Sequence, residues 1–230
     1  MKKCIVLSSG GVDSTTCIAV AIQKYGSDNV ISLSANYGQR HIKELKSAKE
    51  IAKFYNLKHI ELDMAKLFSV SDCPLLSSST NQIPSASYKE QLDITNGLKP
   101  VSTYVPFRNG VFLSCATVFA LSVDAETIYY GAHSDDSCGN AYPDCSDKFV
   151  KYMNSAIYEG SGKLVHCEAP FVNKTKRDIV KIGLELNVPY ELTWSCYNGG
   201  MKPCRKCGTC IDREQAFLSN GVIDPLLIGE

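Results

Sequence analysis

The sequence predicts an α/β fold in which an open, doubly wound parallel sheet of five strands carries helices on both faces. Short apolar runs rich in β-branched residues alternate with amphipathic helical patterns over most of the chain, which is typical of parallel sheets with right-handed crossovers. Polar turns follow several of these runs, at the carboxyl ends of the expected strands, and this is the edge at which open parallel sheets bind ligands. A cysteine-rich segment ends the alternation. We therefore expect a Rossmann-like nucleotide-binding domain over residues 1–190 and a zinc-binding segment packed on it over residues 191–230.

The expected strands and helices alternate along the chain. Strands are expected at residues 4–7, 29–37, 58–62, 127–130 and 164–167, which have the composition of buried parallel strands. Helices are expected after the first strand's loop, at 42–55, 111–123 and 148–159, and after the capping residue Thr175. Residues 72–99 are rich in Ser, Pro, Asn and Thr without clear periodicity, and we interpret them as a lid over the nucleotide site.

The composition is that of a globular protein, and it excludes some classes of function. Apolar residues make up 44% and charged residues 21%, with a formal net charge of +0, so no positive field favours nucleic acid. No apolar segment is long enough to span a bilayer and no signal peptide precedes the first strand. We expect a cytoplasmic protein without membrane or direct nucleic-acid partners. There, the eleven cysteines are expected to be thiols or metal ligands.

The loop after the first strand is the strongest functional signal. Its sequence, SGGVDS, stands between a strand and a helix, where glycines allow close backbone approach and free N–H groups bind phosphate. Asp13 is placed to cap the helix or to help hold a magnesium ion. An ordinary βα turn is the alternative. The predicted ATP-binding residues are Ser8, Ser9, Gly10, Gly11, Val12, Asp13, Ser14, Thr15, Thr16, Cys17 and Ile18.

Three further polar turns supply candidate binding residues. Arg40 follows the second strand and either faces phosphate or caps the next helix. Arg108 precedes an apolar helix, where a cation gains nothing from the dipole, so we expect an anion between them. Asp136 and Asp144 are acceptors suited to the N–H-rich edge of a heterocycle, with Tyr142 as a stacking platform.

Four cysteines near the C-terminus have the spacing of a metal site. Cys196, Cys204, Cys207 and Cys210 lie in TWSCYNGGMKPCRKCGTC, and four thiolates surround one tetrahedral zinc. A [4Fe–4S] cluster is the chemical rival. We favour a structural zinc, because no other feature suggests redox chemistry.

The loop lacks both GxxxxGK[ST] and GxGxxG, and it resembles the PP-loop of ATP pyrophosphatases. The loop and the cysteine segment together resemble the 7-cyano-7-deazaguanine synthase family. This resemblance covers nearly the whole chain. The resemblance is carried by SGGVDSTTC, YGQRH, VPFRN, YPDC, TWSCY with the following cysteines, and a late Asp-Pro. The chain departs from the family pattern at Phe107, where a glycine is typical, and in CGNA before YPDC.

The resemblance implies an adenine nucleotide alpha hydrolase-like fold and conversion of 7-carboxy-7-deazaguanine and ammonia to 7-cyano-7-deazaguanine, in queuosine-type biosynthesis. Two ATP would be used per turnover, with Mg²⁺ and one structural Zn²⁺ per chain. The carboxylate would be adenylated and ammonia would displace AMP to give the amide. The amide oxygen would then be adenylated in turn, and loss of AMP would leave the nitrile. A homodimer is also implied.

In this scheme no dedicated general base is required, because positioning and leaving-group stabilisation dominate. Asp13, Ser14 and Arg108 are the catalytic candidates. Arg40 and Lys176 add positive charge for the phosphates. Asp136 and Asp144 would meet the guanine-like edge of the substrate.

Other functions stay open at this point. Within the family, a variant could stop at the amide or serve DNA modification. A tRNA-modifying PP-loop enzyme would need a basic surface and an RNA-binding module, which the neutral charge and the length of 230 residues do not favour. A non-catalytic zinc module is the remaining class.

Overall fold

The computed structural model describes residues 2–228. Its strands are β1 (Lys3–Leu7), β2 (Val30–Asn36), β3 (Lys58–Asp63), β4 (Ala125–Tyr129) and β5 (His166–Glu168). Its α-helices are α1 (Val12–Tyr25), α2 (Lys43–Phe54), α3 (Ala65–Phe68), α4 (Tyr88–Thr95), α5 (Arg108–Ser122), α6 (Ser134–Ser137), α7 (Asp147–Gly160), α8 (Lys176–Glu185) and α9 (Gly208–Leu218). Short 3₁₀ helices are η1 (Ser27–Asn29), η2 (Cys138–Asn140), η3 (Pro143–Cys145), η4 (Tyr190–Leu192) and η5 (Pro225–Leu227).

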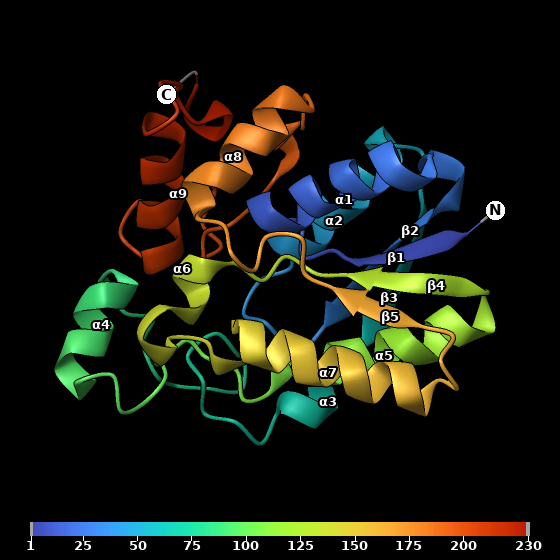
Figure 1. The fold of residues 1–230 in the computed structure, drawn as a ribbon. Coiled ribbons are helices and arrows are strands. Elements are labelled where there is room, and N and C mark those ends of the chain that lie inside the picture. Colours follow the sequence, from blue (N-terminus) through green and yellow to red (C-terminus); the bar gives the residue numbers. More distant parts are fainter. Residues whose placement is uncertain (1, 229–230) are drawn as a thin grey trace.

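The five strands form one parallel sheet in the order β3-β2-β1-β4-β5. The chain builds outward from β1 in both directions, so the fold is the predicted doubly wound α/β fold. Helices α1, α2, α8 and α9 cover one face, and α5 and α7 cover the other (Figure 1). The strand order reverses between β1 and β4, which is the place where open α/β sheets bind ligands.

The alternation of side chains along β1 explains why this strand is central. Cys4 and Val6 lie in the core cluster beneath α1, α2 and α8, whereas Ile5 lies in the cluster beneath α5 and α7. All three are completely buried. A strand buried on both faces has a continuous apolar sequence, and this pattern made the first strand recognisable.

Four α-helices were not predicted from the sequence: the one-turn helices α3 and α6, and the longer helices α4 and α9. The two longer helices have local reasons. α4 lies within the expected irregular stretch, where Ser87 and Glu90 form a reciprocal capping box that starts the helix. α9 begins directly after Cys207 and contains Cys210, and its buried residues include Arg213, which interrupts the apolar stripe. The Arg213 guanidinium is paired with the Asp224 carboxylate at 2.6 and 2.8 Å, which makes its burial possible.

The C-terminal segment packs on the rest of the chain through backbone and core contacts. The Trp194 amide donates to the Gly10 carbonyl over 2.8 Å, and Phe217 of α9 is buried in the core that α1 and α8 share. Of the helices within residues 2–228, none combines the length and the apolar character needed to cross a membrane.

Candidate active site

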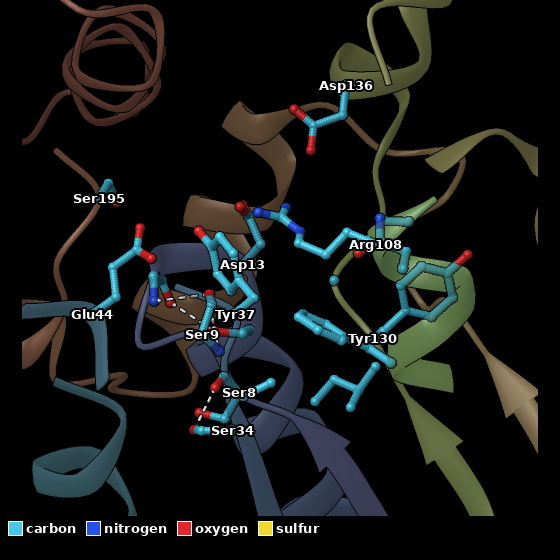
Figure 2. Close-up of a pocket in the computed structure, with 18 of the residues that line it drawn as sticks. Ser8, Ser9, Asp13, Ser34, Tyr37, Glu44, Arg108, Tyr130, Asp136 and Ser195 are labelled. Atoms are coloured by element: carbon cyan, nitrogen blue, oxygen red, sulfur yellow. Dashed lines mark hydrogen bonds between the residues drawn. The ribbon is translucent and has the colours of Figure 1, made fainter. Parts of the chain in front are cut away.

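A cavity lies at the carboxyl edge of the sheet, beside the point where the strand order reverses. Its walls come from the ends of β1, β2 and β4, the first turns of α2, α5 and α8, and the segment after η4. Sequence-predicted residues that line it are Ser8, Ser9, Gly11, Asp13, Ser14, Arg108, Asp136, Tyr142 and Lys176. Figure 2 shows several of these side chains converging from separate elements.

The loop between β1 and α1 has the geometry of an anion cradle. Gly10 has φ +82°, and a Cβ there would lie 2.3 Å from the Glu44 carbonyl oxygen, so the loop requires glycine. The Ser14 hydroxyl accepts from the Ser9 amide at 3.2 Å and is 3.1 Å from the Ser9 hydroxyl. Gly11 is the N-cap of α1 and supplies no side-chain cap. The first-turn N–H groups of α1 therefore have no side-chain capping acceptor, and the cavity beside them can receive an anion.

The remaining predicted ATP-binding residues have side chains engaged elsewhere. The Thr15 hydroxyl donates to the Gly11 carbonyl at 2.7 Å, and the Thr16 hydroxyl donates to the Val12 carbonyl at 2.9 Å. Val12, Cys17 and Ile18 are buried in the core with α8. Gly10, Val12, Thr15, Thr16, Cys17 and Ile18 do not line the cavity, and their part in ATP binding stays a prediction.

Asp13 belongs to a charged network rather than to the helix cap. Its Oδ2 is 2.7 Å from the Lys176 Nζ and 3.8 Å from His133 Nε2. His133 Nε2 is in turn 3.3 Å from the Asp136 carboxylate. Burial raises the pKa of the Asp13 carboxyl, but the charges of Lys176 and His133 outweigh this and leave the pKa below its ordinary value. The other Asp13 oxygen, Oδ1, is buried and has no hydrogen-bond partner within the described chain, which leaves it available to a bound cation.

Arg108 begins α5 and places its guanidinium 5.0 Å from the ring centroid of Tyr37, a stacking arrangement that keeps the cation inside the cavity. The next residue, Asn109, also lines the cavity. The backbone N–H of Asn109 donates to the Asp144 carboxylate over 2.9 Å. Asp144 therefore fixes the first turn of α5 by this hydrogen bond.

Two of the residues predicted to bind substrate or phosphate also lie outside the cavity. Asp144 is 3% exposed and does not line it. The Arg40 guanidinium donates to the carbonyls of Leu76, Ser79 and Asn81, so Arg40 ties down the start of the irregular stretch. Their roles in substrate and phosphate binding stay predictions.

Glu44 is a cavity residue that sequence reasoning missed. It extends from the first turn of α2 into the cavity, across from Arg108 (Figure 2). Burial raises the pKa of its carboxyl from 4.5 to about 7, although the Arg108 charge opposes this. In the sequence an acid in a first helical turn indicates only a favourable dipole interaction. Its place four residues after Arg40, in a turn at the ligand-binding edge, was the available signal.

The four C-terminal cysteines meet as predicted. The Sγ atoms of Cys196, Cys204, Cys207 and Cys210 all lie within 4.8 Å of one another. One tetrahedral zinc with 2.3 Å bonds separates its sulfur atoms by about 3.8 Å, so the group fits a single metal ion. A cubane cluster binds each thiolate through a different iron and separates the sulfur atoms further. The Cys204 Sγ also accepts from the amides of Lys206 and Cys207 at 3.4 Å, which stabilises a thiolate.

Comparison with known proteins agrees with this arrangement. The sequence model for the queuosine biosynthesis protein QueC matches residues 3–221. A 7-cyano-7-deazaguanine synthase from Archaeoglobus fulgidus is 41% identical over 229 residues, which cover 99% of this chain and 91% of that protein. This chain belongs to the QueC family. A second relative, the 7-cyano-7-deazaguanine synthase of Caldicellulosiruptor saccharolyticus, is 41% identical and covers 97% of this chain and 94% of its own length.

Solved structures share the fold at low identity. An NMN synthetase from Francisella tularensis has a TM-score of 0.53 and 15% identity, covering 96% of this chain and 78% of its own. The U34-tRNA thiolase NcsA from Methanococcus maripaludis, solved with its [4Fe–4S] cluster, has a TM-score of 0.50 and 12% identity. The match covers 95% of this chain and 66% of the thiolase chain. At this level of identity the likenesses show the fold alone.

The departures from the family pattern have visible structural consequences. Phe107 is the N-cap of α5 and has φ +54°, the left-handed conformation for which glycine is suited. Its ring packs edge-on against Phe149, with centroids 5.9 Å apart. In the CGNA segment, Gly139 and Asn140 are both left-handed. Both departures lie beside the cavity wall that contains Tyr142.

Proposed function

We propose that this protein converts 7-carboxy-7-deazaguanine and ammonia to 7-cyano-7-deazaguanine at the expense of ATP. The observation that carries the proposal is that one cavity combines an anion cradle with a carboxylate and an aromatic ring suited to a heterocycle. Membership of the QueC family and 41% identity to a named synthase support it.

The PP-loop and the neighbouring cations supply the chemistry that adenylation needs. Attack of a carboxylate on the α-phosphate releases pyrophosphate, whose developing charge must be stabilised. The N–H groups at the start of α1 and the hydroxyls of Ser9 and Ser14, which line the cavity, would bind the departing pyrophosphate. Lys176, held by Asp13 at 2.7 Å, and Arg108 add positive charge. The same groups act again when the amide oxygen is adenylated.

Asp13 and magnesium belong to the same step. The unpartnered Oδ1 of Asp13 fits a cation with oxygen ligands. When bound, Mg²⁺ would neutralise charge on the phosphates of ATP. Asp13 thus has two functions in the proposal: it positions Lys176 and offers an oxygen to the cation.

The substrate heterocycle would lie against Asp136 and Tyr142. Asp136 and Tyr142 line the same cavity, where the carboxylate would accept hydrogen bonds from the N–H groups of a flat heterocycle and the ring would add apolar contact. Ammonia would reach the carbonyl carbon of the adenylate and displace AMP. Holding ammonia and the adenylate close together would supply most of the rate enhancement of this step.

The cysteine cluster is proposed to bind one structural zinc, as its sulfur geometry supports. The residues between Cys196 and α8 include Trp194 and Ser195, which line the cavity. Zinc would therefore hold one wall of the active site in place. All eleven cysteines are free of disulfides, which supports a cytoplasmic location. A homodimer, implied by family resemblance, is tested by sedimentation.

The decisive experiment is mass spectrometry of products after incubation with ATP, Mg²⁺, ammonium and 7-carboxy-7-deazaguanine. We expect the nitrile and about two AMP for each nitrile formed, because two oxygen atoms leave as AMP. Amide alone would indicate a variant that stops at the half-reaction. No AMP would contradict the proposal and direct the search to other acceptors, beginning with tRNA.

A further inference from the structure

Four hydroxyl groups form a hydrogen-bonded chain in the wall of the cavity. Thr103 Oγ1 is 2.7 Å from the Tyr142 hydroxyl, which is 3.3 Å from that of Tyr197. The Tyr197 hydroxyl is 2.8 Å from that of Tyr88. The three tyrosines line the cavity, and they come from α4, from the turn before η3 and from the segment after Cys196. Because these segments are distant in sequence, no single element requires the chain of hydroxyls.

The buried end of this chain fixes the direction of its hydrogen bonds. Thr103 is 2% exposed, and Tyr142 is the one partner of its hydroxyl within residues 2–228. If the Thr103 hydroxyl accepted from Tyr142, its own hydrogen would be buried without an acceptor, which is costly. Thr103 therefore donates to Tyr142, and Tyr142 donates onward to Tyr197.

One hydroxyl hydrogen then remains without an acceptor at the Tyr88–Tyr197 end of the chain. Each hydroxyl has a single hydrogen, so Tyr88 and Tyr197 have two between them but share one hydrogen bond. The further hydroxyl beside them is that of Tyr142, whose hydrogen is already directed to Tyr197, and the described residues give the pair no other side-chain hydrogen bond. Burial raises the pKa of both hydroxyls well above the ordinary value, so both keep their hydrogens. The pair presents one O–H donor to the cavity that both residues line.

An acceptor lies beside this donor. The Asp136 carboxylate lines the same cavity, and its negative charge acts on Tyr88, Tyr142 and Tyr197. A donor next to a carboxylate is complementary to a heterocycle edge on which a carbonyl oxygen stands next to N–H groups. An adenine-type edge, with an amino group in place of the carbonyl, would oppose donor to donor.

We propose that Tyr88 and Tyr197 are specificity-determining residues that select a lactam-type heterocycle by donating one hydrogen bond to its ring carbonyl. This inference rests on the proposed function and deepens it, because it assigns the carbonyl side of the substrate edge. It also gives α4, within the predicted lid, a direct part in recognition through Tyr88.

The test compares two substrates in the full-length, metal-loaded protein. One is 7-carboxy-7-deazaguanine, and the other is its analogue with hydrogen in place of the ring carbonyl. We expect the wild type to prefer the first in kcat/KM by about 10-fold or more, the effect of one buried hydrogen bond. The double variant Tyr88→Phe/Tyr197→Phe should lose this preference, with its ratio of kcat/KM values for the two compounds falling to about 1.

Matched controls separate recognition from folding. Tyr152→Phe changes an exposed tyrosine of α7 and should keep the wild-type preference, and thermal melting should show that each variant is folded. The single variants Tyr88→Phe and Tyr197→Phe identify which hydroxyl donates. A folded double variant that retains the full preference would overturn the inference.

The test also distinguishes failure of the inference from failure of the proposed function. If the wild type releases no AMP with 7-carboxy-7-deazaguanine, the proposed function fails. Calorimetric binding of the same two compounds then tests the tyrosine pair directly, and equal affinity of wild type and double variant for the carbonyl compound would overturn it.

Discussion

At the residue scale, the cavity contains charged groups that are held out of water and stabilised by one another. The Asp13–Lys176 pair is 22% and 13% exposed. Removing one partner of such a pair leaves the other charge uncompensated, which costs more than the pair contributes. The same residues are therefore sensitive positions for stability and for activity.

For Asp13→Asn we expect AMP release to fall about 100-fold or more, because Lys176 loses its fixed position beside the leaving group. Stability should fall by about 3 kcal/mol, because the Lys176 charge is left buried without its partner. AMP assays and denaturant unfolding measure the two effects. Asp28→Asn, at an exposed position in η1, is the control. Unchanged AMP release in Asp13→Asn would remove this carboxylate from the mechanism.

Glu44 gives a prediction about pH. Its folded-state pKa of about 7 lies above the value of 4.5 for a free carboxyl. Between these values the unfolded chain loses the proton and the folded protein keeps it, so the free energy of unfolding falls as the pH rises from about 4.5 to about 7 and changes no further above that. Glu44→Gln removes that cost. We expect it to stabilise the ligand-free protein by about 3 kcal/mol at pH 8 and to change little at pH 4.

Thermal melting of wild type and Glu44→Gln across this pH range measures the effect. Glu50→Gln, an exposed position on the same helix, is the control. A stabilisation of equal size at pH 4 and pH 8 would contradict the explanation based on ionisation.

At the element scale, helix α5 starts from a residue with a strained backbone conformation, Phe107. Phe107 takes a left-handed conformation that costs an L-residue about 1 kcal/mol, and its ring contact with Phe149 offsets part of that cost. Phe107→Ala keeps the backbone strain and loses the ring contact, whereas Phe107→Gly loses both. We expect the glycine variant to be about 1 kcal/mol more stable than the alanine variant. Chemical denaturation compares them, and the reverse order would show that the left-handed backbone is not strained.

The cysteine segment is the element that joins the metal site to the cavity. Cys207 is the N-cap of α9 and one of the four clustered thiols. We expect Cys207→Ser to lose the metal and to lower both melting temperature and AMP release, because the wall containing Trp194 loses its support. Elemental analysis checks the metal, and Cys138→Ser, an exposed thiol, should behave as wild type. Iron with a visible absorbance band in the wild type would contradict zinc.

At the scale of the whole molecule, residues 191–228 share a core with the predicted nucleotide-binding domain. Phe217 and Ala216 fill the core that α1 and α8 share, and Trp194 bonds to the PP-loop at Gly10. We expect a chain that ends at residue 190 to lose cooperative thermal unfolding, because α1 and α8 would expose apolar surface. Circular dichroism during heating measures this. A cooperative transition like that of the full chain would show that the first 190 residues fold alone.

Local patterns in the sequence were sufficient for the sheet, the PP-loop and the metal cluster. The strand of Cys4, Ile5 and Val6 is apolar throughout because both its faces are buried, and Gly10 stands where the turn of the loop requires glycine. The four cysteines were recognisable because metal ligands need particular spacings. Each of these signals lies within a few consecutive residues.

The tertiary structure alone decided which side chains share the cavity. Glu44 faces it because α2 packs against Gly10, and Arg40 does not because carbonyls of a later loop bind its guanidinium. The hydroxyl chain of Tyr88, Tyr142 and Tyr197 joins three segments that no local pattern relates. The sequence by itself thus determined the fold class and the motifs, because they follow from local periodicity and backbone chemistry. The recognition surface depends on long-range packing, which brings residues more than a hundred positions apart into hydrogen-bonding distance.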